Sequence, residues 1–386
     1  MNKFIPYGKQ WIDEKDVESV VSVLESDWLT NGPKVAEFEK KFAKYVNANF
    51  AVAVSSGTAA LHTASFAAGI SKGDEVITTP MTFAASSNCV LYQDGNPVFA
   101  DIDKKTYNID PDKIRKKITK EIKAIIPVDY TGQPCELDEI NEIAEEQDLT
   151  VIEDASHAVG SAYKGKKIGS ISDLSIFSFH PVKHMTTGEG GMITTDSKEL
   201  YDKMMLFRNH GIIKDEDDFI SKSDDGWFYE QQILGYNYRI TDLQSALGIS
   251  QLSKIDDFIK RRIKIVKGYN EAFETVDEII TPFHPDYVNP SWHLYVIQLN
   301  LEKLSVTRKK VFDELRKNGL GVQVHYIPVY FHPYYQKLGY KKGLCPNAEW
   351  LYDRIISLPL YPKMTDKEVD YVIETVKNVV NKHSIS

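Results

Sequence analysis

Seven short apolar runs recur along residues 51–195, separated by stretches with the spacing of amphipathic helices. The strand candidates are AVAV at 51–54, EVITT at 75–79, PVFA at 97–100, AIIPV at 124–128, TVIE at 150–153, LSIFSF at 174–179 and GMITT at 191–195. The helix candidates lie near 57–69, 82–93, 110–118 and 137–147. Continuous apolar runs are typical of strands that are buried on both faces. The pattern therefore predicts an α/β fold with a mainly parallel, seven-stranded sheet and helices on both of its faces.

The N-terminal residues precede this pattern. An extended arm ends near Trp11, and Val35, Phe38, Phe42 and Tyr45 follow at spacings of 3, 4 and 3. Such spacing predicts one buried face of a helix. We expect the arm and a first helix to occupy residues 1–30.

The sequence pattern changes at Thr241 from short apolar runs to a long, charged helical stretch, which predicts a second domain. From 241 to 273 the chain reads as a long, charged helix without glycine between Gly248 and Gly268. Strand candidates then lie at 293–299 and 322–327, and helix candidates at 307–318 and 366–381. We therefore expect a large domain over 31–250 and a smaller C-terminal α/β domain over 251–386.

The composition is that of a folded globular protein, with 42% hydrophobic and 26% charged residues among 386. A net charge of −9 gives no reason to expect a nucleic-acid or membrane-surface partner. Cys89, Cys135 and Cys345 are odd in number and far apart, so neither a disulfide framework nor a zinc knuckle is expected. Because no apolar run approaches the ~20 residues that span a bilayer, we expect a cytoplasmic protein. The acidic stretch 214–225 predicts a solvated loop.

Three motifs could carry chemistry, and the first is Ser55-Ser56-Gly57-Thr58. It lies where a strand is predicted to end and a helix to begin. Helix N-termini present free N–H groups, and glycine lets an anion approach the backbone closely. Ser and Thr are also favoured helix caps, so the segment alone predicts either a phosphate site or a capped helix start.

The second motif is Glu153-Asp154, with His157 three residues after Asp154. Both carboxylates lie at the predicted carboxyl end of a strand, which is the edge where open α/β sheets bind ligands. Asp154 could pair with a cationic group there. An acidic turn in solvent would give the same pattern.

The third motif places Lys183 between a strand end and the glycine-rich return at 188–191. Its neighbours are apolar or small, and desolvation lowers the pKa of a lysine amine and makes it a usable nucleophile. An ordinary surface lysine is the alternative. His180 and His184 have the spacing of a helical metal pair, but Pro181 between them interrupts a helix, so no metal site is expected.

The order of the motifs favours one cofactor. A phosphate-like loop comes first, then Asp154, then Lys183 another 29 positions along the chain. A phosphate grip, a carboxylate for a pyridinium nitrogen and an amine for a Schiff base are what pyridoxal 5'-phosphate requires of a protein.

With these motifs in this order, the chain resembles the DegT/DnrJ/EryC1/StrS family of nucleotide-sugar aminotransferases. The similar segments are Ile5-Pro6-Tyr7, WLTNGPKV, SSGTAALH, TPMTFAASSN, VDYTGQP, IEDASHAVGS, SFHPVKHMTTGEGG and GYNYRITDLQSALG. They cover most of the chain. The resemblance implies the fold-type-I architecture of pyridoxal phosphate enzymes and a homodimer with composite active sites.

The resemblance also implies roles for individual residues. Lys183 looks like the Schiff-base lysine, Asp154 like the partner of the pyridine nitrogen and His157 like a neighbour of the ring's 3-oxygen. Many family members carry glutamine at the position of His157. The other cofactor contacts implied are the backbone of Gly57 and Thr58 and the hydroxyl of Ser178 at the phosphate, Phe83 on the ring, and Asn237 at the phosphate of the neighbouring subunit.

Sugar-nucleotide contacts follow in the same way. The residues implied are Tyr7, Asp27, Trp28, Leu29, Thr30, Ser56, His325, Tyr326, Ile327 and Pro328. Within the family, FSFHPVKHMTTGEGG and VQVHYIPVY look most like the 4-aminotransferases of the pseudaminic acid pathway. That similarity implies two substrates, L-glutamate and a UDP-linked 4-keto-6-deoxy amino sugar, UDP-2-acetamido-2,6-dideoxy-β-L-arabino-hex-4-ulose.

Three other functions compete with this one. The enzyme could aminate another UDP- or dTDP-linked keto-deoxysugar. It could be a pyridoxal phosphate-dependent sugar dehydratase, but in those a histidine replaces the lysine, and Lys183 stands in the motif here. A non-enzymatic regulator is disfavoured because the phosphate loop, Asp154 and Lys183 occur together.

Overall fold

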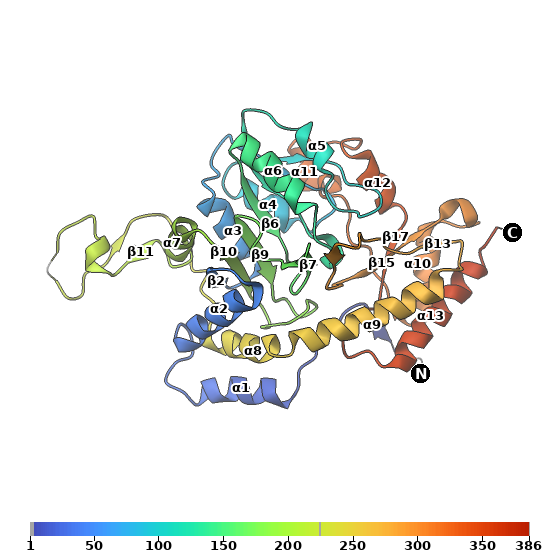
Figure 1. Ribbon diagram of the computed structural model, residues 1–386, viewed down its shortest axis with the longest axis horizontal. Helices are drawn as coiled ribbons and strands as arrows, with labels where there is room; N and C mark the ends of the chain where they lie inside the picture. Colours follow the sequence, from blue (N-terminus) through green and yellow to red (C-terminus); the bar gives the residue numbers. More distant parts are fainter. Residues whose placement is uncertain (1–3, 224, 386) are drawn as a thin grey trace.

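The computed structural model describes residues 4–223 and 225–385, and a seven-stranded sheet lies at its centre (Figure 1). The strand order is β2-β10-β9-β6-β5-β3-β4; β10 runs antiparallel to β2 and β9, and the other neighbours are parallel. The strands are β2 (Phe50–Val54), β3 (Glu75–Thr78), β4 (Asn96–Phe99), β5 (Ile122–Ile126), β6 (Thr150–Asp154), β9 (Leu174–Ser178) and β10 (Gly191–Thr195). The predicted mainly parallel, seven-stranded sheet is confirmed.

Helices cover both faces of the sheet. One face is covered by α2 (Pro33–Val46), α5 (Pro111–Arg115), α6 (Leu137–Gln147) and α8 (Asp242–Leu252), and the other by α3 (Gly57–Ala67), α4 (Ala85–Leu91) and α7 (Lys198–Phe207). Successive strand residues enter opposite cores: Val151 packs in the core with Phe42 and Ile140, and Ile152 packs in the core with Leu61. Burial on both faces explains why the strand sequences are continuously apolar.

The N-terminal arm crosses from one part of the molecule to the other. Strand β1 (Ile5–Pro6) pairs in parallel with β16 (Leu320–Gly321), which belongs to the C-terminal part. Helix α1 (Glu14–Leu24) then packs against α8. Its buried Asp16 accepts a hydrogen bond from Lys254 at 2.7 Å, which ties the helix down. This path carries Tyr7 past the edge of the central sheet.

Helix α9 (Ile255–Phe273) joins the two cores (Figure 1). Its first turns contribute Ile255 and Ile259 to the core beside the large sheet, and its later turns contribute Ile265 and Tyr269 to a second core. That second core also holds a three-stranded sheet of β13 (Ile279–Ile280), β15 (Tyr295–Leu299) and β17 (Ile355–Leu358), with α10 (Arg308–Lys317) and α13 (Asp366–Asn381). In the described part of the chain no helix combines the length and apolarity needed to cross a membrane. The domain limits at residues 30 and 250 stay a prediction.

Two sequence expectations for the C-terminal half need correction. The stretch 241–273 is not one helix, because a turn at Ser253 and Lys254 separates α8 from α9. The strand expected at 322–327 does not form; only Gln323 makes a single bridge, to Ser357. The alternation in VQVHYI suggested a strand, but its side chains have separate partners: Val322 packs in the second core, His325 contacts Ser357, and Tyr326 contacts His157.

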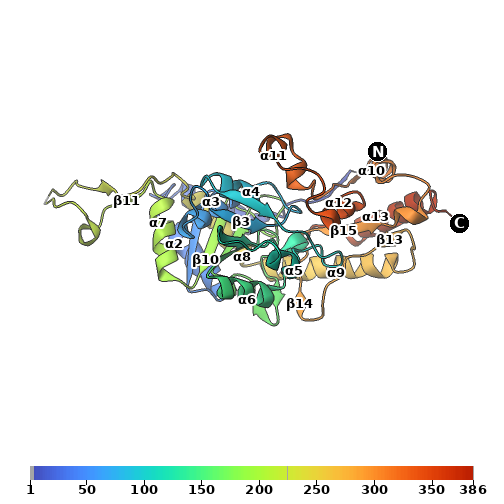
Figure 2. The ribbon, with the colours of Figure 1, turned by 90° about the horizontal axis from the view of Figure 1, so that it is seen from above.

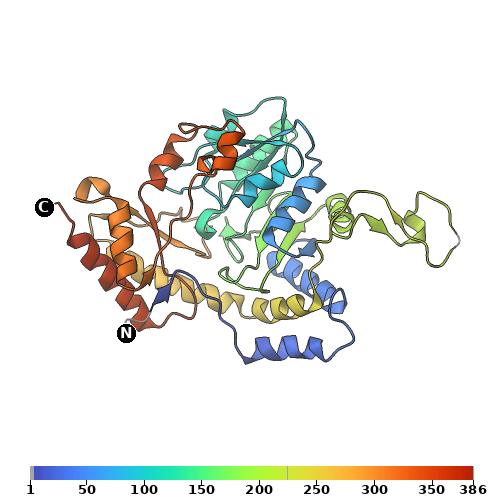
Figure 3. The same cartoon turned by 180° about the vertical axis from the view of Figure 1, so that it is seen from behind.

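A hairpin of β11 (Ile212–Ile213) and β12 (Glu230–Gln231) projects from the body, far from the C-terminal elements (Figures 1, 2 and 3). The described residues of the acidic stretch 214–225 lie in it and are largely exposed, which confirms the predicted solvated loop. Asp224 of that stretch, residues 1–3 of the predicted arm and Ser386 lie outside the described residues.

Candidate active site

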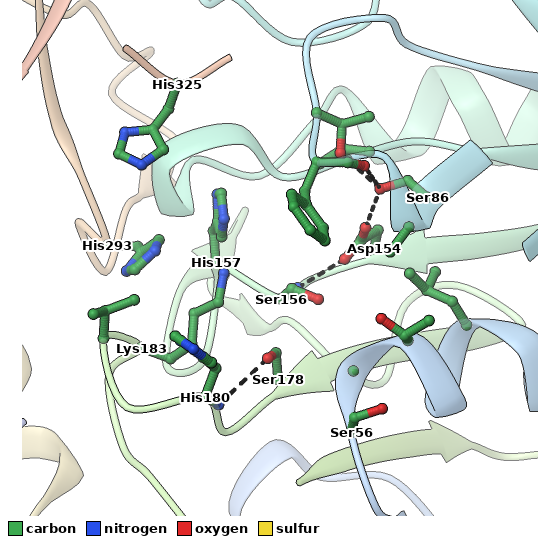
Figure 4. Close-up of a pocket in the computed structure, with 18 of the residues that line it drawn as sticks. Ser56, Ser86, Asp154, Ser156, His157, Ser178, His180, Lys183, His293 and His325 are labelled. Carbon is green, nitrogen blue, oxygen red and sulfur yellow. Dashed lines mark hydrogen bonds between the residues drawn. The ribbon is translucent and has the colours of Figure 1, made fainter. Parts of the chain in front are cut away.

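A cavity of about 440 Å³ opens at the carboxyl ends of β6 and β9, where parallel α/β sheets bind ligands (Figure 4). Eleven predicted site residues line it: Tyr7, Ser56, Gly57, Thr58, Phe83, Asp154, His157, Ser178, Lys183, His325 and Tyr326. They come from the arm, the start of α3, the segment just before α4, the ends of β6 and β9 with the loops that follow them, and the loop after β16. The three motifs, which are distant in sequence, therefore meet in one place.

The start of α3 forms one end of the cavity. Ser56 caps the helix, its Oγ accepting the backbone N–H of Ala59 at 3.0 Å. Gly57 lies against β9, and a Cβ there would be 3.0 Å from the Cβ of Ser178. Glycine therefore leaves the first helical N–H groups, which have no acceptor within the helix, open toward the cavity.

Asp154 is the last residue of β6 and is 4% exposed. Its Oδ2 accepts the hydroxyl of Ser86 at 2.6 Å, and its Oδ1 accepts the backbone N–H of Ser156 at 3.1 Å (Figure 4). A carboxylate that is hydrogen-bonded on both oxygens has a fixed plane. It can present a negative charge to a cationic group in the cavity.

Lys183 lies in the loop that follows β9, where its backbone N–H donates to the carbonyl of His180 at 2.9 Å. Burial lowers the pKa of Lys183 to about 8, although the negative charge of Asp154 acts in the opposite direction. A substantial fraction of this amine is neutral near pH 7 to 8, as a nucleophile requires.

Aromatic rings form the wall opposite α3. The Tyr326 hydroxyl lies 3.1 Å from His157 Nε2, and the rings of His157 and His293 have centroids 4.4 Å apart. His325 is held from behind, with Nδ1 2.8 Å from the hydroxyl of Ser357. These contacts replace the backbone ladder that a strand at 322–327 would have made.

The imidazoles of this wall are neutral around pH 7. Burial, followed by the positive charge of Lys183, lowers the pKa of His325 to about 4 and holds the pKa of His157 and of His293 well below the usual range. Neutral rings can donate or accept hydrogen bonds without adding positive charge to the site. Among the residues that the structure describes, no group of three or more His, Cys, Asp or Glu side chains could hold a metal ion.

Some predicted residues lie outside this cavity. Asp27, Trp28, Leu29 and Thr30 belong to the exposed connection between α1 and α2, where Trp28 is 57% exposed. Ile327 and Pro328 follow the His325–Tyr326 wall without lining the cavity. Asn237 pairs with Asn209 in an isolated bridge, also away from the lining. Within one chain the structure does not bring these residues to the site.

Sequence reasoning missed part of the lining. The additional residues are Leu61, Thr82, Ala85, Ser86, Val128, Ser156, His180, Val182, Glu189 and His293. Ser156 and His180 lie inside the motifs already noted, so a broader reading of those motifs would have found them. Ser86 lies in the segment TPMTFAASSN noted for the resemblance and reaches the cavity from the first turn of α4. No sequence signal marks His293, which lies in a bend just before β15 (Tyr295–Leu299).

Beneath Asp154 lie two other acids, Asp129 and Glu153, both fully buried. Burial and the negative charge of Glu153 hold the pKa of Asp129 well above its usual range, so the Asp129 carboxyl keeps its proton and donates it to Glu153. Glu153 also accepts the hydroxyl of Ser175 at 2.6 Å. The pair therefore carries one negative charge rather than two.

This pair should make stability depend on pH. A group whose pKa is raised by folding stabilises fully below its unfolded pKa, about 3.9 for Asp, and loses that contribution as the pH rises through the folded value. Asp129→Asn cannot titrate, so the free energy of unfolding of the wild type should fall relative to the variant as the pH rises from the unfolded pKa toward the raised folded pKa. Urea unfolding followed by circular dichroism measures the difference. Parallel pH curves for the two proteins would contradict the shared proton.

A model of the DegT/DnrJ/EryC1/StrS aminotransferase family matches residues 10–377. The chain belongs to this family. It is 47% identical to the spore coat polysaccharide biosynthesis protein SpsC of Bacillus subtilis and 40% identical to the UDP-4-amino-4,6-dideoxy-N-acetyl-β-L-altrosamine transaminase of Campylobacter jejuni, over 98% of each chain in both cases. It is therefore a sugar aminotransferase.

Solved structures agree with this assignment. Helicobacter pylori PseC, an aminotransferase involved in the biosynthesis of pseudoaminic acid, superposes with a TM-score of 0.91 at 32% identity, over 98% of this chain and 100% of PseC. The putative sugar aminotransferase Spr1654 of Streptococcus pneumoniae in its PMP form gives 0.92 at 32% identity, over 98% and 99%. The family match and these superpositions show that the chain has the fold-type-I architecture and that its cofactor is pyridoxal 5'-phosphate.

The residues of the cavity fit that cofactor. The open N-terminus of α3 suits a phosphate, the Asp154 carboxylate suits a pyridinium nitrogen, and Lys183 is an amine of lowered pKa. His157 adds a further sign, because its buried Nδ1 has no hydrogen-bond partner among the described residues. A buried polar atom without a partner is costly unless a ligand satisfies it.

Proposed function

We propose that this sugar aminotransferase moves the amino group of L-glutamate to C4 of UDP-2-acetamido-2,6-dideoxy-β-L-arabino-hex-4-ulose. The product would be UDP-4-amino-4,6-dideoxy-N-acetyl-β-L-altrosamine. The observation that carries the proposal is 40% identity, over 98% of both chains, to a transaminase named for that product. The similarity to PseC supports the same pathway.

Lys183 and Asp154 would carry the chemistry. Pyridoxal phosphate, when bound, supplies an electron sink for the carbon that loses its proton. The Lys183 amine would bind the cofactor covalently and, when released, move a proton to and from that carbon as general base and acid. The Asp154 carboxylate would hold the proton on the pyridine nitrogen. Glutamate leaves as 2-oxoglutarate, and C4 of the sugar changes from ketone to amine.

Other residues would bind and orient. The backbone of Gly57 and Thr58 and the Ser178 hydroxyl would hold the phosphate, Phe83 would cover the ring, and His157 would face its 3-oxygen. Tyr7, Ser56 and the His325–Tyr326 wall would receive the sugar. Binding energy from the UDP group, which is remote from C4, would fix the face that receives hydrogen.

The residues outside the cavity would act across a homodimer. The turn at 27–30 is tied to the start of α8 by Asp242, whose backbone N–H donates to the Thr30 carbonyl at 2.8 Å and whose carboxylate accepts the N–H of Gly32 at 2.9 Å. Asn237 lies five residues before Asp242 in the chain, and both segments would enter the cavity of a second copy. There Asn237 would contact the cofactor phosphate and Asp27, Trp28, Leu29 and Thr30 the sugar nucleotide.

Mixing inactive subunits tests the shared site. Lys183→Ala and Asn237→Ala subunits should each be inactive as homodimers, but one of the two sites of a mixed dimer would carry neither substitution. We expect mixing to restore activity, at most to half of the wild-type rate per mixed dimer. Subunit exchange is verified by two affinity tags. Exchange without recovery, although both parents are inactive, would argue against composite sites.

Substrate choice tests the sugar. We expect a preference for the β-L-arabino 4-keto sugar over its D-xylo epimer, which differs at C5, because the His325–Tyr326 wall and Tyr7 must meet the C5 methyl once UDP is anchored. One misplaced methyl changes transition-state binding by roughly 1–3 kcal/mol, so kcat/KM should differ by about ten- to two-hundred-fold. The measurement uses saturating glutamate and NMR of the product. Equal or faster turnover of the D-xylo epimer would remove the pseudaminic assignment and leave the aminotransferase intact.

A different keto-deoxysugar is the second candidate. The relative that is 47% identical is named for spore coat polysaccharide biosynthesis, not for the altrosamine product. A panel of UDP- and dTDP-linked keto-deoxysugars, assayed with glutamate under the same conditions, distinguishes the two candidates.

A further inference from the structure

We infer that Ser86 is a positioning residue for Asp154, and that Thr82 and Ser86 form a hydroxyl relay that donates hydrogen bonds in one direction onto its carboxylate. The inference rests on the proposed role of Asp154 in the site. Both hydroxyls lie in the segment TPMTFAASSN that carries the resemblance, but neither was assigned a role in the site from sequence. Both line the cavity.

The contacts determine the direction of the relay. Ser86 Oγ lies 2.6 Å from Asp154 Oδ2 (Figure 4). It also lies 2.6 Å from Thr82 Oγ1 and, in a longer contact, 3.3 Å from the Phe83 carbonyl. A hydroxyl has one proton to donate, and an ionised carboxylate only accepts. Ser86 therefore gives its proton to Asp154 and accepts the proton of Thr82. Distances of 2.5–2.7 Å are typical of O–H donors to a charged oxygen.

The relay is almost completely buried. Ser86 is 1% and Thr82 3% exposed, and Asp154 is 4% exposed. In such surroundings a hydrogen bond to a charged group is stronger than in water, and its loss leaves a poorly solvated charge. The contact spans 68 positions and joins the first turn of α4 to the end of β6.

The chemical consequence concerns the proton affinity of Asp154. A hydrogen bond donated to the charged form lowers the affinity of a carboxylate for a proton. With Ser86 in place, a proton shared with a ring nitrogen in the cavity stays on the nitrogen. Without it, the Asp154 carboxylate loses a donor that stabilises its negative charge, and the shared proton moves toward the carboxylate.

A purely structural role is the competing explanation, and α4 supplies the control. Ser87 is also fully buried, and its hydroxyl donates to the Ala84 carbonyl of its own helix at 3.3 Å. It does not line the cavity. Ser87→Ala therefore removes a buried hydroxyl from the same helix without touching Asp154.

The experiment reconstitutes the apoprotein with pyridoxal phosphate labelled with ¹⁵N in the ring, and measures the ring-nitrogen chemical shift and the steady-state kinetics. The variants are Ser86→Ala, Thr82→Val, Ser87→Ala and Asp154→Asn. We expect Ser86→Ala to move the shift toward that of the unprotonated ring and to lower kcat about tenfold, with KM for the sugar nucleotide unchanged. Thr82→Val should move the shift in the same direction by less, and Ser87→Ala should leave it in place.

The outcomes separate the two proposals. Wild-type shift and kcat in Ser86→Ala, with Asp154→Asn strongly impaired, would overturn the relay and leave the proposed role of Asp154 standing. Equal effects of Ser87→Ala and Ser86→Ala would also overturn it. If Ser86→Ala does not fold, Thr82→Val decides, because an unchanged shift in that variant contradicts the relay. A normal shift in Asp154→Asn would instead contradict the proposed function of the site.

Discussion

Replacing Lys183 with alanine should abolish sugar amination and covalent attachment of the cofactor together. Among the residues that the structure describes, Lys183 is the only lysine that lines the cavity, and burial lowers its pKa to about 8. No other amine is positioned to replace it as nucleophile or as the group that moves the proton. We expect the wild type to be yellow. After desalting, the variant should show no visible absorption band from a covalently bound cofactor. Its turnover should be at least a thousandfold lower, which corresponds to a loss of about 4 kcal/mol in transition-state stabilisation.

Borohydride reduction followed by mass spectrometry measures the attachment directly. It should fix the cofactor to the wild type and leave Lys183→Ala unmodified. Lys198→Ala is the matched control, because that lysine is exposed and pairs with Asp202 on the surface of α7. Amination by Lys183→Ala at a rate near that of the wild type would show that the wrong lysine was assigned.

The central sheet was predictable from sequence because burial on both faces leaves its strands continuously apolar. Val151 and Ile152 are neighbours in sequence and lie in opposite cores, and both must be hydrophobic. The C-terminal part has no such redundancy. There, VQVHYI has the alternating pattern of a strand. In the structure His325 instead contacts Ser357, Tyr326 contacts His157, and the two residues form a wall of the cavity.

The site was predictable where its residues lie in contiguous motifs at strand ends. Asp154 and Lys183 each follow a parallel strand, and these ends meet at one edge of the sheet. His293, and the contact of Ser86 with Asp154, could not be found in that way. His293 packs against His157 across 136 positions and Ser86 contacts Asp154 across 68, and such contacts exist only after the chain has folded.

Asn237 and residues 27–30 lie outside the cavity of their own chain, although the resemblance assigns them to the site. Their proposed place is therefore the cavity of a second copy, and the mixed-dimer experiment tests this for Asn237.

Asp154→Asn should bind the cofactor more weakly and turn over far more slowly than the wild type. A neutral amide cannot hold a proton on a ring nitrogen through charge. One charge-assisted contact is worth roughly 1.5–3 kcal/mol, or about one to two decades in rate, before any effect on the electron sink is counted. The reaction should therefore be slowed by more than the loss of affinity alone explains.

The surroundings of Asp154 make asparagine a poorer substitute still. Oδ2 receives the hydroxyl of Ser86 and Oδ1 receives the N–H of Ser156, so both oxygens face donors. With its NH₂ toward Ser156, asparagine leaves that backbone N–H without an acceptor. With its NH₂ toward Ser86, it forces the hydroxyl to turn its proton to the longer contact with the Phe83 carbonyl at 3.3 Å. We therefore expect a lower free energy of unfolding, by about 1–3 kcal/mol, in addition to the catalytic defect.

Asp129→Asn is the matched control, since it replaces another buried aspartate that does not line the cavity. The measurements are the cofactor dissociation constant of the apoprotein, kcat/KM with the keto sugar and glutamate, and urea unfolding. We expect Asp129→Asn to keep the wild-type dissociation constant within about twofold, because its carboxyl is already protonated and an amide can replace its donor. Near-normal turnover by Asp154→Asn would show that Asp154 does not hold the proton on the ring nitrogen. The hydrogen bonds that Ser86 and Ser156 donate to its carboxylate would then have no catalytic role.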